Sequence, residues 1–273
     1  MWPLRRQVKK AFFAFLIMKP FVLETFRIQS DVADRDFEIT VFSSGKAVAD
    51  RPLFVFHDGQ NLFDDAKATY GRSWRLLDVL TQDDFPDCVF AGITCGEGST
   101  RFDDYCSFPF DAFAQAKTGA NRAVGGYGDR YLRFVYTELL PILHNRFPSQ
   151  RRIVMGGSSL GGYISTVAAL RYPAETDGII ALSNAFWVAT DPLIDLIGKQ
   201  GGNLGRMYLD IGDHESDEPE MNRIVMEAQA RVVDAVKGMN PAGFRSEIIE
   251  NGTHNEASWG DRIEEILRWF IKF

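Results

Sequence analysis

With 273 residues, the chain is long enough to bury a large apolar core without disulfides or a structural metal. Its composition, 45% hydrophobic and 25% charged, is ordinary for a soluble globular protein. The formal net charge is −7, and no basic block stands out beyond Arg5, Arg6, Lys9 and Lys10. This argues against a nucleic-acid partner, because neutralising phosphates needs a basic face.

The cysteines are few and scattered. Cys88, Cys95 and Cys106 form no CxxC pair, which argues against a disulfide framework and against a zinc knuckle. We therefore expect free thiols in a reducing compartment, the cytoplasm. Neither a metal nor a cofactor is implied, and the oligomeric state cannot be read from the sequence.

The first twenty residues resemble the start of a signal peptide without completing one. The basic residues precede an apolar stretch from 11 to 18, but Lys19 and Pro20 follow it instead of a small-residue cleavage site. This stretch is too short to span a bilayer, so we expect no stable membrane insertion. Translation from Met18 is an alternative explanation of the extra residues. We expect 1–20 to be an N-terminal extension without an assigned role, with export not favoured, and 21–273 to form one domain.

Strand and helix patterns alternate along the rest of the chain. Short apolar or alternating runs that end in loop-forming residues predict strands over 36–43, 52–56, 88–94, 152–155, 178–182, 206–211 and 244–249. Apolar residues at 3–4 spacing predict helices over 73–80, 129–147, 161–171, 219–236 and 256–273. This alternation predicts an α/β fold with a mainly parallel central sheet and helices on both faces.

The segment 96–128 has no regular pattern. We expect a long loop over the active-site end of the sheet, since loops of this length usually have a function. Its aromatic side chains are expected to form a wall of the pocket; they are Phe102, Tyr105, Phe108, Phe110, Phe113 and Tyr127.

A serine flanked by glycines lies between a predicted strand and a predicted helix. In the run Gly157-Ser158-Ser159-Leu160-Gly161, only Ser159 is centred between the two glycines. This is the pattern of a nucleophile elbow, in which side chains two residues before and after the serine would collide with the backbone. The turn also places the N–H of Leu160 at a helix N-terminus, where it can bind an oxyanion. A phosphate-binding loop is the alternative, but the lysine and the glycine spacing that it needs are missing.

A serine nucleophile needs a histidine as its base. The chain order in α/β-hydrolases is serine, acid, histidine. Of the four histidines, only His254 leaves room for an acid between itself and Ser159, and it lies just before the last predicted helix. We therefore expect His254 to be the base.

The acid that orients the histidine is expected after the strand over 206–211. The carboxylates there are Asp210, Asp213, Glu215, Asp217 and Glu218. We choose Glu215, three residues after Gly212 at the turn where the chain leaves the sheet, with Asp213 as the second candidate. The acid would fix the tautomer of the histidine and stabilise its imidazolium form.

Four segments together resemble the putative esterase family, which includes esterase D, enterochelin esterase and feruloyl esterases. They are HDGQNLFD at 57–64, GGSSLGG at 156–162, LDIGDHE at 209–215 and GTHNEASW at 252–259. The resemblance implies an α/β-hydrolase fold and a serine carboxylic-ester hydrolase acting on a small-molecule ester. It also implies that Gln60 supplies the second oxyanion N–H, that His57 shapes the loop behind it, and that Glu215 is the acid.

Two other functions remain open at this stage. An acyltransferase would use the same triad with another acceptor in place of water. A non-catalytic binding protein on an esterase scaffold would be expected to have a broken triad, whereas Ser159, Glu215 and His254 are all present in the right order.

Overall fold

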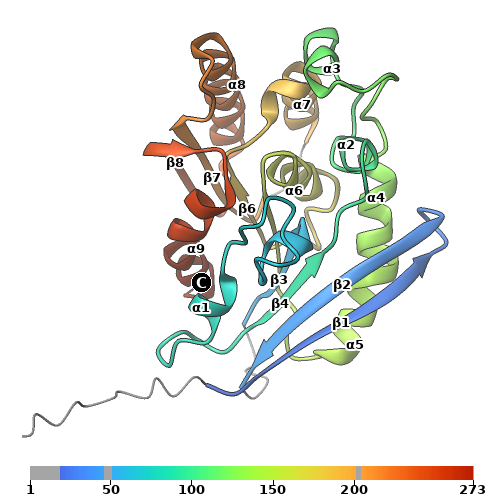
Figure 1. Ribbon diagram of the computed structural model, residues 1–273, viewed down its shortest axis with the longest axis vertical. Helices are drawn as coiled ribbons and strands as arrows, with labels where there is room; N and C mark the ends of the chain where they lie inside the picture. Colours follow the sequence, from blue (N-terminus) through green and yellow to red (C-terminus); the bar gives the residue numbers. More distant parts are fainter. Residues whose placement is uncertain (1–18, 46–50, 201–203, 273) are drawn as a thin grey trace, which may run out of the picture.

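The computed structural model describes residues 19–45, 51–200 and 204–272. Most of the proposed extension, residues 1–18, lies outside this range. The described chain forms one eight-stranded sheet with the strand order β1-β2-β4-β3-β5-β6-β7-β8 (Figure 1). The strands are β1 Phe21–Ser30, β2 Arg35–Ser44, β3 Leu53–His57, β4 Val89–Ile93, β5 Ile153–Ser158, β6 Gly178–Leu182, β7 Arg206–His214 and β8 Gly243–Thr253.

The sheet is mainly parallel, as the alternating pattern predicts. All neighbours from β4 to β8 in this order run parallel, whereas β1 pairs antiparallel with β2, and β2 pairs antiparallel with β4. Strand β1 is absent from the sequence-based prediction. Its side chains are mostly exposed or half-buried, so it shows no clean alternation, and its strand form depends on the ten-residue ladder with β2.

Helices cover both faces of the sheet. They are α1 Leu76–Leu80, α2 Thr100–Asp104, α3 Ala112–Thr118, α4 Gly128–Phe134, α5 Leu140–Arg146, α6 Leu160–Arg171, α7 Thr190–Lys199, α8 Pro219–Gly238 and α9 Glu256–Ile271. The apolar residues of α1 and α9 form one core cluster, and those of α4 to α8 form the other. Figure 1 shows α1 and α9 next to each other, with α4 and α5 end to end along another side. The expected α/β-hydrolase layering is therefore present.

Strand β3 shows how one strand serves both clusters. Leu53 and Val55 join the larger cluster, whereas Phe54 and Phe56 join the smaller one. A strand buried on both faces needs no polar alternation, which explains its continuous apolar run. Its last residue, His57, is also buried and brings the following loop to the carboxyl end of the sheet.

The helix predicted over 129–147 is a continuous rod with a change of winding in its middle. A π-helical turn, η2 Val135–Leu139, separates α4 from α5. Pro141 lies in the first turn of α5 and has no N–H to donate to the preceding turn. The wider winding just before it accommodates this missing hydrogen bond.

One prediction about the irregular segments is wrong, and one helix was missed. The segment 96–128 is not one loop, because it contains α2 and α3; the side chain of Asp111 caps α3 by accepting a hydrogen bond from Ala114 N at 2.8 Å. Helix α7 was not predicted either, since only Leu193 and Ile197 mark its buried face. Among the described helices, none has the length and apolarity needed to cross a membrane.

Candidate active site

Ser159 lies in a tight turn between β5 and α6. Its backbone has φ 56° and ψ −122°, a conformation that L-residues rarely adopt. The turn is closed by hydrogen bonds from Ser159 N to Leu182 O at 2.8 Å and from Ala185 N to Ser159 O at 3.2 Å. A Cβ atom on Gly157 would lie 3.0 Å from the backbone of Gly161. The glycines therefore allow the close approach that a nucleophile elbow requires.

Glu215 and His254 meet beyond the ends of β7 and β8. Nδ1 of His254 lies 2.6 Å from Oε2 of Glu215, and the other carboxylate oxygen accepts a hydrogen bond from Gly212 N at 2.5 Å. The Glu215 side chain is 1% exposed and that of His254 is 37% exposed. Asn222 Oδ1 accepts from Glu215 N at 2.9 Å and so holds the backbone of this turn. The carboxylate is thus fixed from two sides and directed at the histidine.

The other candidate acids face elsewhere. Asp213 contacts the ring of His214 at 2.6 Å, and this hydrogen bond holds the pKa of Asp213 below its usual value. Asp210 is buried within β7 and forms an ion pair with Arg262 at 2.7 Å. Of the carboxylates weighed from the sequence, the structure brings Glu215 to His254.

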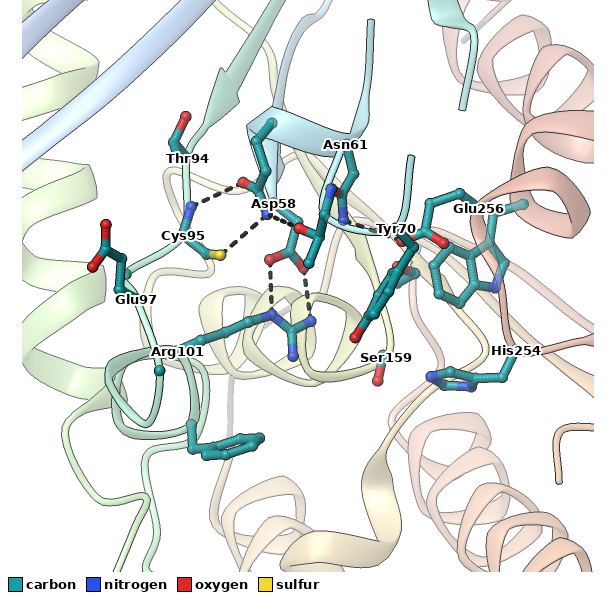
Figure 2. Close-up of a pocket in the computed structure, with 17 residues that line it drawn as sticks. Asp58, Asn61, Tyr70, Thr94, Cys95, Glu97, Arg101, Ser159, His254 and Glu256 are labelled. Atoms are coloured by element: carbon teal, nitrogen blue, oxygen red, sulfur yellow. Dashed lines mark hydrogen bonds and ion pairs between the residues drawn. The ribbon is translucent and has the colours of Figure 1, made fainter. Parts of the chain in front are cut away.

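Ser159 and His254 line the same pocket, which has a volume of about 590 Å³. Figure 2 shows the hydroxyl of Ser159 beside the imidazole of His254, with Tyr70 and Glu256 nearby. The two side chains come from the carboxyl ends of β5 and β8. In a parallel sheet these ends lie at one edge, which is where open α/β sheets bind their ligands.

The two expected oxyanion donors lie at the starts of helical turns. Leu160 is the first residue of α6, and Gln60 lies in the 3₁₀ turn η1 Gly59–Asn61, which begins after Asp58 in a left-handed conformation. The first N–H groups of a helix have no acceptor within it. Both N–H groups are therefore available to an oxyanion, and Gln60 lines the pocket together with Ser159.

The side chain of Gln60 joins two loops. Its Nε2 donates to Cys95 Sγ at 3.1 Å, and its Oε1 accepts from Cys95 N at 3.1 Å. This pair connects the segment after β3 to the segment after β4. Burial raises the pKa of the Cys95 thiol to about 12, so the only cysteine that lines this pocket stays protonated near neutral pH and is a poor nucleophile.

Asp58 and Arg101 form a bidentate ion pair in the pocket wall. Arg101 Nε and Nη2 donate to the two carboxylate oxygens at 2.8 and 2.7 Å. Burial alone would raise the pKa of Asp58, but the charge and hydrogen bonds of Arg101 outweigh it and lower that pKa. The pair therefore stays ionised and links α2 to the turn that carries Gln60.

His57 lies behind this turn and is separated from solvent. Its Nδ1 is 2.7 Å from the hydroxyl of Tyr131, and burial lowers its pKa to about 3. The ring is thus neutral near pH 7. Its Cβ would be 3.2 Å from a Cβ on Gly161, so it packs against the elbow from beneath.

Glu256 is a pocket residue that sequence reasoning missed. It is buried, lines the pocket and accepts a hydrogen bond from Asn61 Nδ2 at 3.1 Å. Burial raises the pKa of this carboxyl group. Its position two residues after His254 in the chain was the available signal, since it begins the helix that follows the histidine.

The aromatic wall differs from the one expected. Of the six aromatic residues proposed from 96–128, only Phe102 lines the pocket; the other aromatic lining residues are Tyr70 and Trp259. Tyr105 and Phe110 are buried in the core, while Phe113 and Tyr127 are largely exposed. Side chains on the short helices of this segment point in several directions, so the segment does not present one aromatic face.

Within the described residues, no group of three or more His, Cys, Asp or Glu side chains is arranged to hold a metal ion. The three cysteines are free thiols. The polar groups of the pocket thus include two serines, two threonines, a tyrosine, a histidine, carboxylates, amides and one arginine.

Comparison with known proteins identifies the family of the chain. The family model described as "Putative esterase" matches residues 30–270. The chain belongs to this esterase family. The prediction of an esterase, a hydrolase of ester bonds, is confirmed at the level of the family.

The chain is similar to one curated relative and to several solved structures. The uncharacterized protein YbbA of Bacillus subtilis is 26% identical over 226 residues, which cover 80% of this chain and 84% of the relative. The IroE-like serine hydrolase of Shewanella oneidensis has a TM-score of 0.73 at 18% identity, covering 90% of this chain and 80% of that one. The siderophore hydrolase EstA of Aspergillus nidulans has a TM-score of 0.68 at 14% identity, covering 92% and 94%.

The enterobactin esterase FES of Shigella flexneri is a longer protein with the same fold in part of its chain. Its TM-score is 0.68 at 18% identity; the match covers 92% of this chain but only 58% of the FES chain. At such identities, these structures establish the α/β-hydrolase type of fold.

Proposed function

We propose that this protein is a serine carboxylic-ester hydrolase that works through an acyl-enzyme on Ser159, with Glu215 and His254 completing the triad. The observation that carries the proposal is the 2.6 Å contact between His254 Nδ1 and Glu215 Oε2. With the carboxylate ionised, Nδ1–H is the donor, so Nε2 is left with a lone pair that can accept the serine proton.

Acylation begins when Oγ of Ser159 attacks the ester carbonyl carbon while Nε2 of His254 takes the hydroxyl proton. The tetrahedral intermediate carries its negative charge on the former carbonyl oxygen, which the N–H groups of Leu160 and Gln60 bind. When this intermediate collapses, the bond to the alcohol oxygen breaks, and His254 returns the proton to the leaving alcohol.

Deacylation repeats these steps with water as the nucleophile. His254 takes a proton from the water, the hydroxide attacks the acyl carbon, and the serine leaves with the proton. Each oxyanion donor typically lowers the barrier by about 3–4 kcal/mol, which is about a hundred- to a thousand-fold in rate. Glu215 stabilises the imidazolium that forms in both halves of the reaction.

The proposed substrate is a small-molecule ester. A pocket of about 590 Å³ is of the size that holds such ligands, which commonly falls between about 300 and 1,000 Å³. Tyr70, Phe102 and Trp259 line it, and aromatic walls suit an ester with a planar or bulky group. Similar folds occur in a ferulic acid esterase and in an enterobactin esterase whose structure was determined in the presence of a dihydroxybenzoyl-serine, which makes esters of aromatic acids the first class to assay.

Replacement of Ser159 tests the proposal. Ser159→Ala should keep the fold and abolish both p-nitrophenyl acetate hydrolysis and fluorophosphonate labelling. Ser165→Ala is the matched control, because Ser165 lies in the helix that follows Ser159 and its hydroxyl donates to Gly161 O at 2.8 Å; it should keep both. Wild-type turnover by Ser159→Ala would refute the assignment.

The same experiment separates the alternative functions. A binding protein on an esterase scaffold would not be labelled by the fluorophosphonate. An acyltransferase would be labelled, but would form mainly a new ester instead of free acid when an alcohol is added.

A further inference from the structure

The ring of His254 rests against a tryptophan. The imidazole and the indole of Trp259 meet edge to face, with centroids 5.2 Å apart and planes at 84°. A single hydrogen bond from Nδ1 to Glu215 would still let the ring pivot about that bond. The indole, which is itself buried, blocks this pivot and so sets the direction of Nε2.

Trp259 is held in turn by a serine beyond β6. Its Nε1 donates to Ser183 Oγ at 2.8 Å. The same oxygen accepts from Arg262 Nη2 at 3.1 Å, and Ser183 N donates to Asp210 Oδ1 at 2.8 Å. Ser183 has φ 45°, so its backbone is held in a left-handed conformation by these surroundings.

Arg262 lies at the centre of this network and uses every donor that it has. Nε and Nη2 donate to the two oxygens of Asp210 at 2.7 and 3.1 Å, and Nη2 also reaches Ser183. Nη1 donates to the carbonyl oxygen of Ser258 at 2.7 Å and to its hydroxyl at 3.0 Å. An arginine has five N–H donors, and these are five hydrogen bonds. The pair is buried, with side-chain exposures of 13% for Arg262 and 0% for Asp210.

A second branch of the network reaches the backbone beside the histidine. The hydroxyl of Ser258 accepts from Thr253 N at 3.3 Å, one residue before His254. At the other end, Asp210 lies in β7, five residues before Glu215. Arg262 therefore connects the strand that leads to the acid with both the ring and the backbone of the base.

We propose that Arg262, held by Asp210, is a positioning residue that fixes the imidazole of His254 through Trp259 and Ser258. The inference rests on the proposed function, in which His254 is the base. Neither Arg262 nor Asp210 is among the residues that line the catalytic pocket. Loss of Arg262 should therefore reduce kcat and leave KM nearly unchanged, since it disturbs the base and not the binding of the ester.

Arg262→Lys tests this role. Lysine keeps the positive charge and most of the length, but it has three donors at one point and cannot serve Asp210, Ser183 and Ser258 together. We expect kcat to fall about 10- to 100-fold, as misplacement of a catalytic group by about 1 Å does, with KM within about two-fold of the wild type.

Arg268→Lys is the matched control. Arg268 lies in the same helix and also makes several hydrogen bonds, but its partners are Glu264, Gln82 and Asp84. It should leave kcat at the wild-type value and, because its partners are more exposed than Asp210, lower the melting temperature no more than Arg262→Lys does. A wild-type kcat in folded Arg262→Lys would overturn the proposal, as would an equal loss of kcat in Arg268→Lys.

A readout that does not need catalysis separates this inference from the proposed function. The proton between Nδ1 of His254 and Glu215 should give a low-field NMR signal in the wild type and in Arg268→Lys, and it should be broadened or lost in Arg262→Lys. An unchanged signal in Arg262→Lys overturns the positioning role. If the wild type shows the signal but hydrolyses no ester, the proposed function fails while the positioning of His254 is still measured.

Two milder variants keep the test decisive if Arg262→Lys does not fold. Ser183→Ala breaks the branch through Trp259, and Ser258→Ala breaks the branch through Thr253; both leave the ion pair with Asp210 in place. Each should lower kcat by several-fold, and the double variant should lower it further. Wild-type kcat in the double variant would overturn the proposal.

Discussion

The catalytic pocket has two halves that are held in different ways. The strand half consists of Ser159, Glu215 and His254, which follow β5, β7 and β8, and the sheet ladder fixes their backbones. The loop half consists of Asp58, Gln60, Tyr70, Cys95 and Arg101, which all line the pocket. Side-chain contacts such as Asp58–Arg101 and Gln60–Cys95 hold this half together. Substitutions in the loop half can therefore change which esters bind, while the backbones of the three strand-half residues stay in place.

The largest effect should come from the acid of the strand half. Glu215→Gln should lower kcat by about 10³- to 10⁴-fold, because a neutral amide neither fixes the right tautomer of His254 nor stabilises its imidazolium form. Asp213→Asn, two residues away and directed at His214, should change kcat by less than about ten-fold. Steady-state kinetics on p-nitrophenyl acetate measures both, and the reverse ranking would move the acid to Asp213.

The next largest effect should come from the ion pair of the loop half. Arg101→Met leaves Asp58 buried without its partner, and breaking a buried pair in this way costs about 3–5 kcal/mol of folding stability. The exposed pair of Arg231 with Asp191 offers a control, since Arg231→Met should cost less than about 1 kcal/mol. Urea unfolding at pH 7 measures both losses of stability. Equal losses would contradict the prediction that the buried pair stabilises the fold more than the exposed one.

His57, where the two halves join, predicts a pH dependence of stability. Its folded pKa of about 3 lies below the usual 6.5, chiefly because of burial. Between these values the unfolded chain binds a proton that the folded protein does not. The free energy of unfolding should therefore fall as the pH drops from about 6.5 towards 3, by at most about 1.4 kcal/mol per pH unit from this group.

His57→Gln removes this titration and should flatten the slope between pH 6.5 and 4. Unfolding curves across this range measure the difference between the variant and the wild type. An imidazole NMR titration of His57 with a midpoint near 6.5 would contradict the expected stability change.

The smallest effect should come from Tyr70, whose ring lies in the loop half and is 80% exposed. Tyr70→Ala should raise KM for an aromatic ester about five-fold, equivalent to about 1 kcal/mol of ring contact, and leave kcat nearly unchanged. Phe113→Ala is the control, because Phe113 lies outside the pocket and packs on Trp187. A change in kcat without a change in KM would contradict this role and indicate that Tyr70 acts on the chemical step.

The strand half could be predicted from the sequence further than the loop half. The glycine spacing around Ser159 and the chain order of His254 express backbone constraints, and such constraints appear as local patterns. The choice between Glu215 and Asp213 depended on the resemblance and on turn position, because their burial is set by the bulge between β7 and β8.

The loop half depends on contacts between distant segments. Gln60 and Cys95 are 35 residues apart, and Asn61 and Glu256 are 195 residues apart. No periodic pattern marks such pairs, which is why Glu256 and Tyr70 were missed and the aromatic wall was wrongly assigned. Strand β1 was missed for the same reason, since its partner and not its own pattern makes it a strand.

The positive φ of Ser159 lowers folding stability at the residue on which the proposed activity depends. A φ of 56° with a ψ of −122° costs about 1–3 kcal/mol of folding stability for a residue with a side chain. The surrounding fold holds this conformation without a bound ester. Glycine adopts the same conformation freely, so Ser159→Gly should be more stable than the wild type, as its melting temperature can show, yet inactive. Under the proposed mechanism, folding stability and catalysis therefore place opposite demands on this residue, and a serine here favours catalysis.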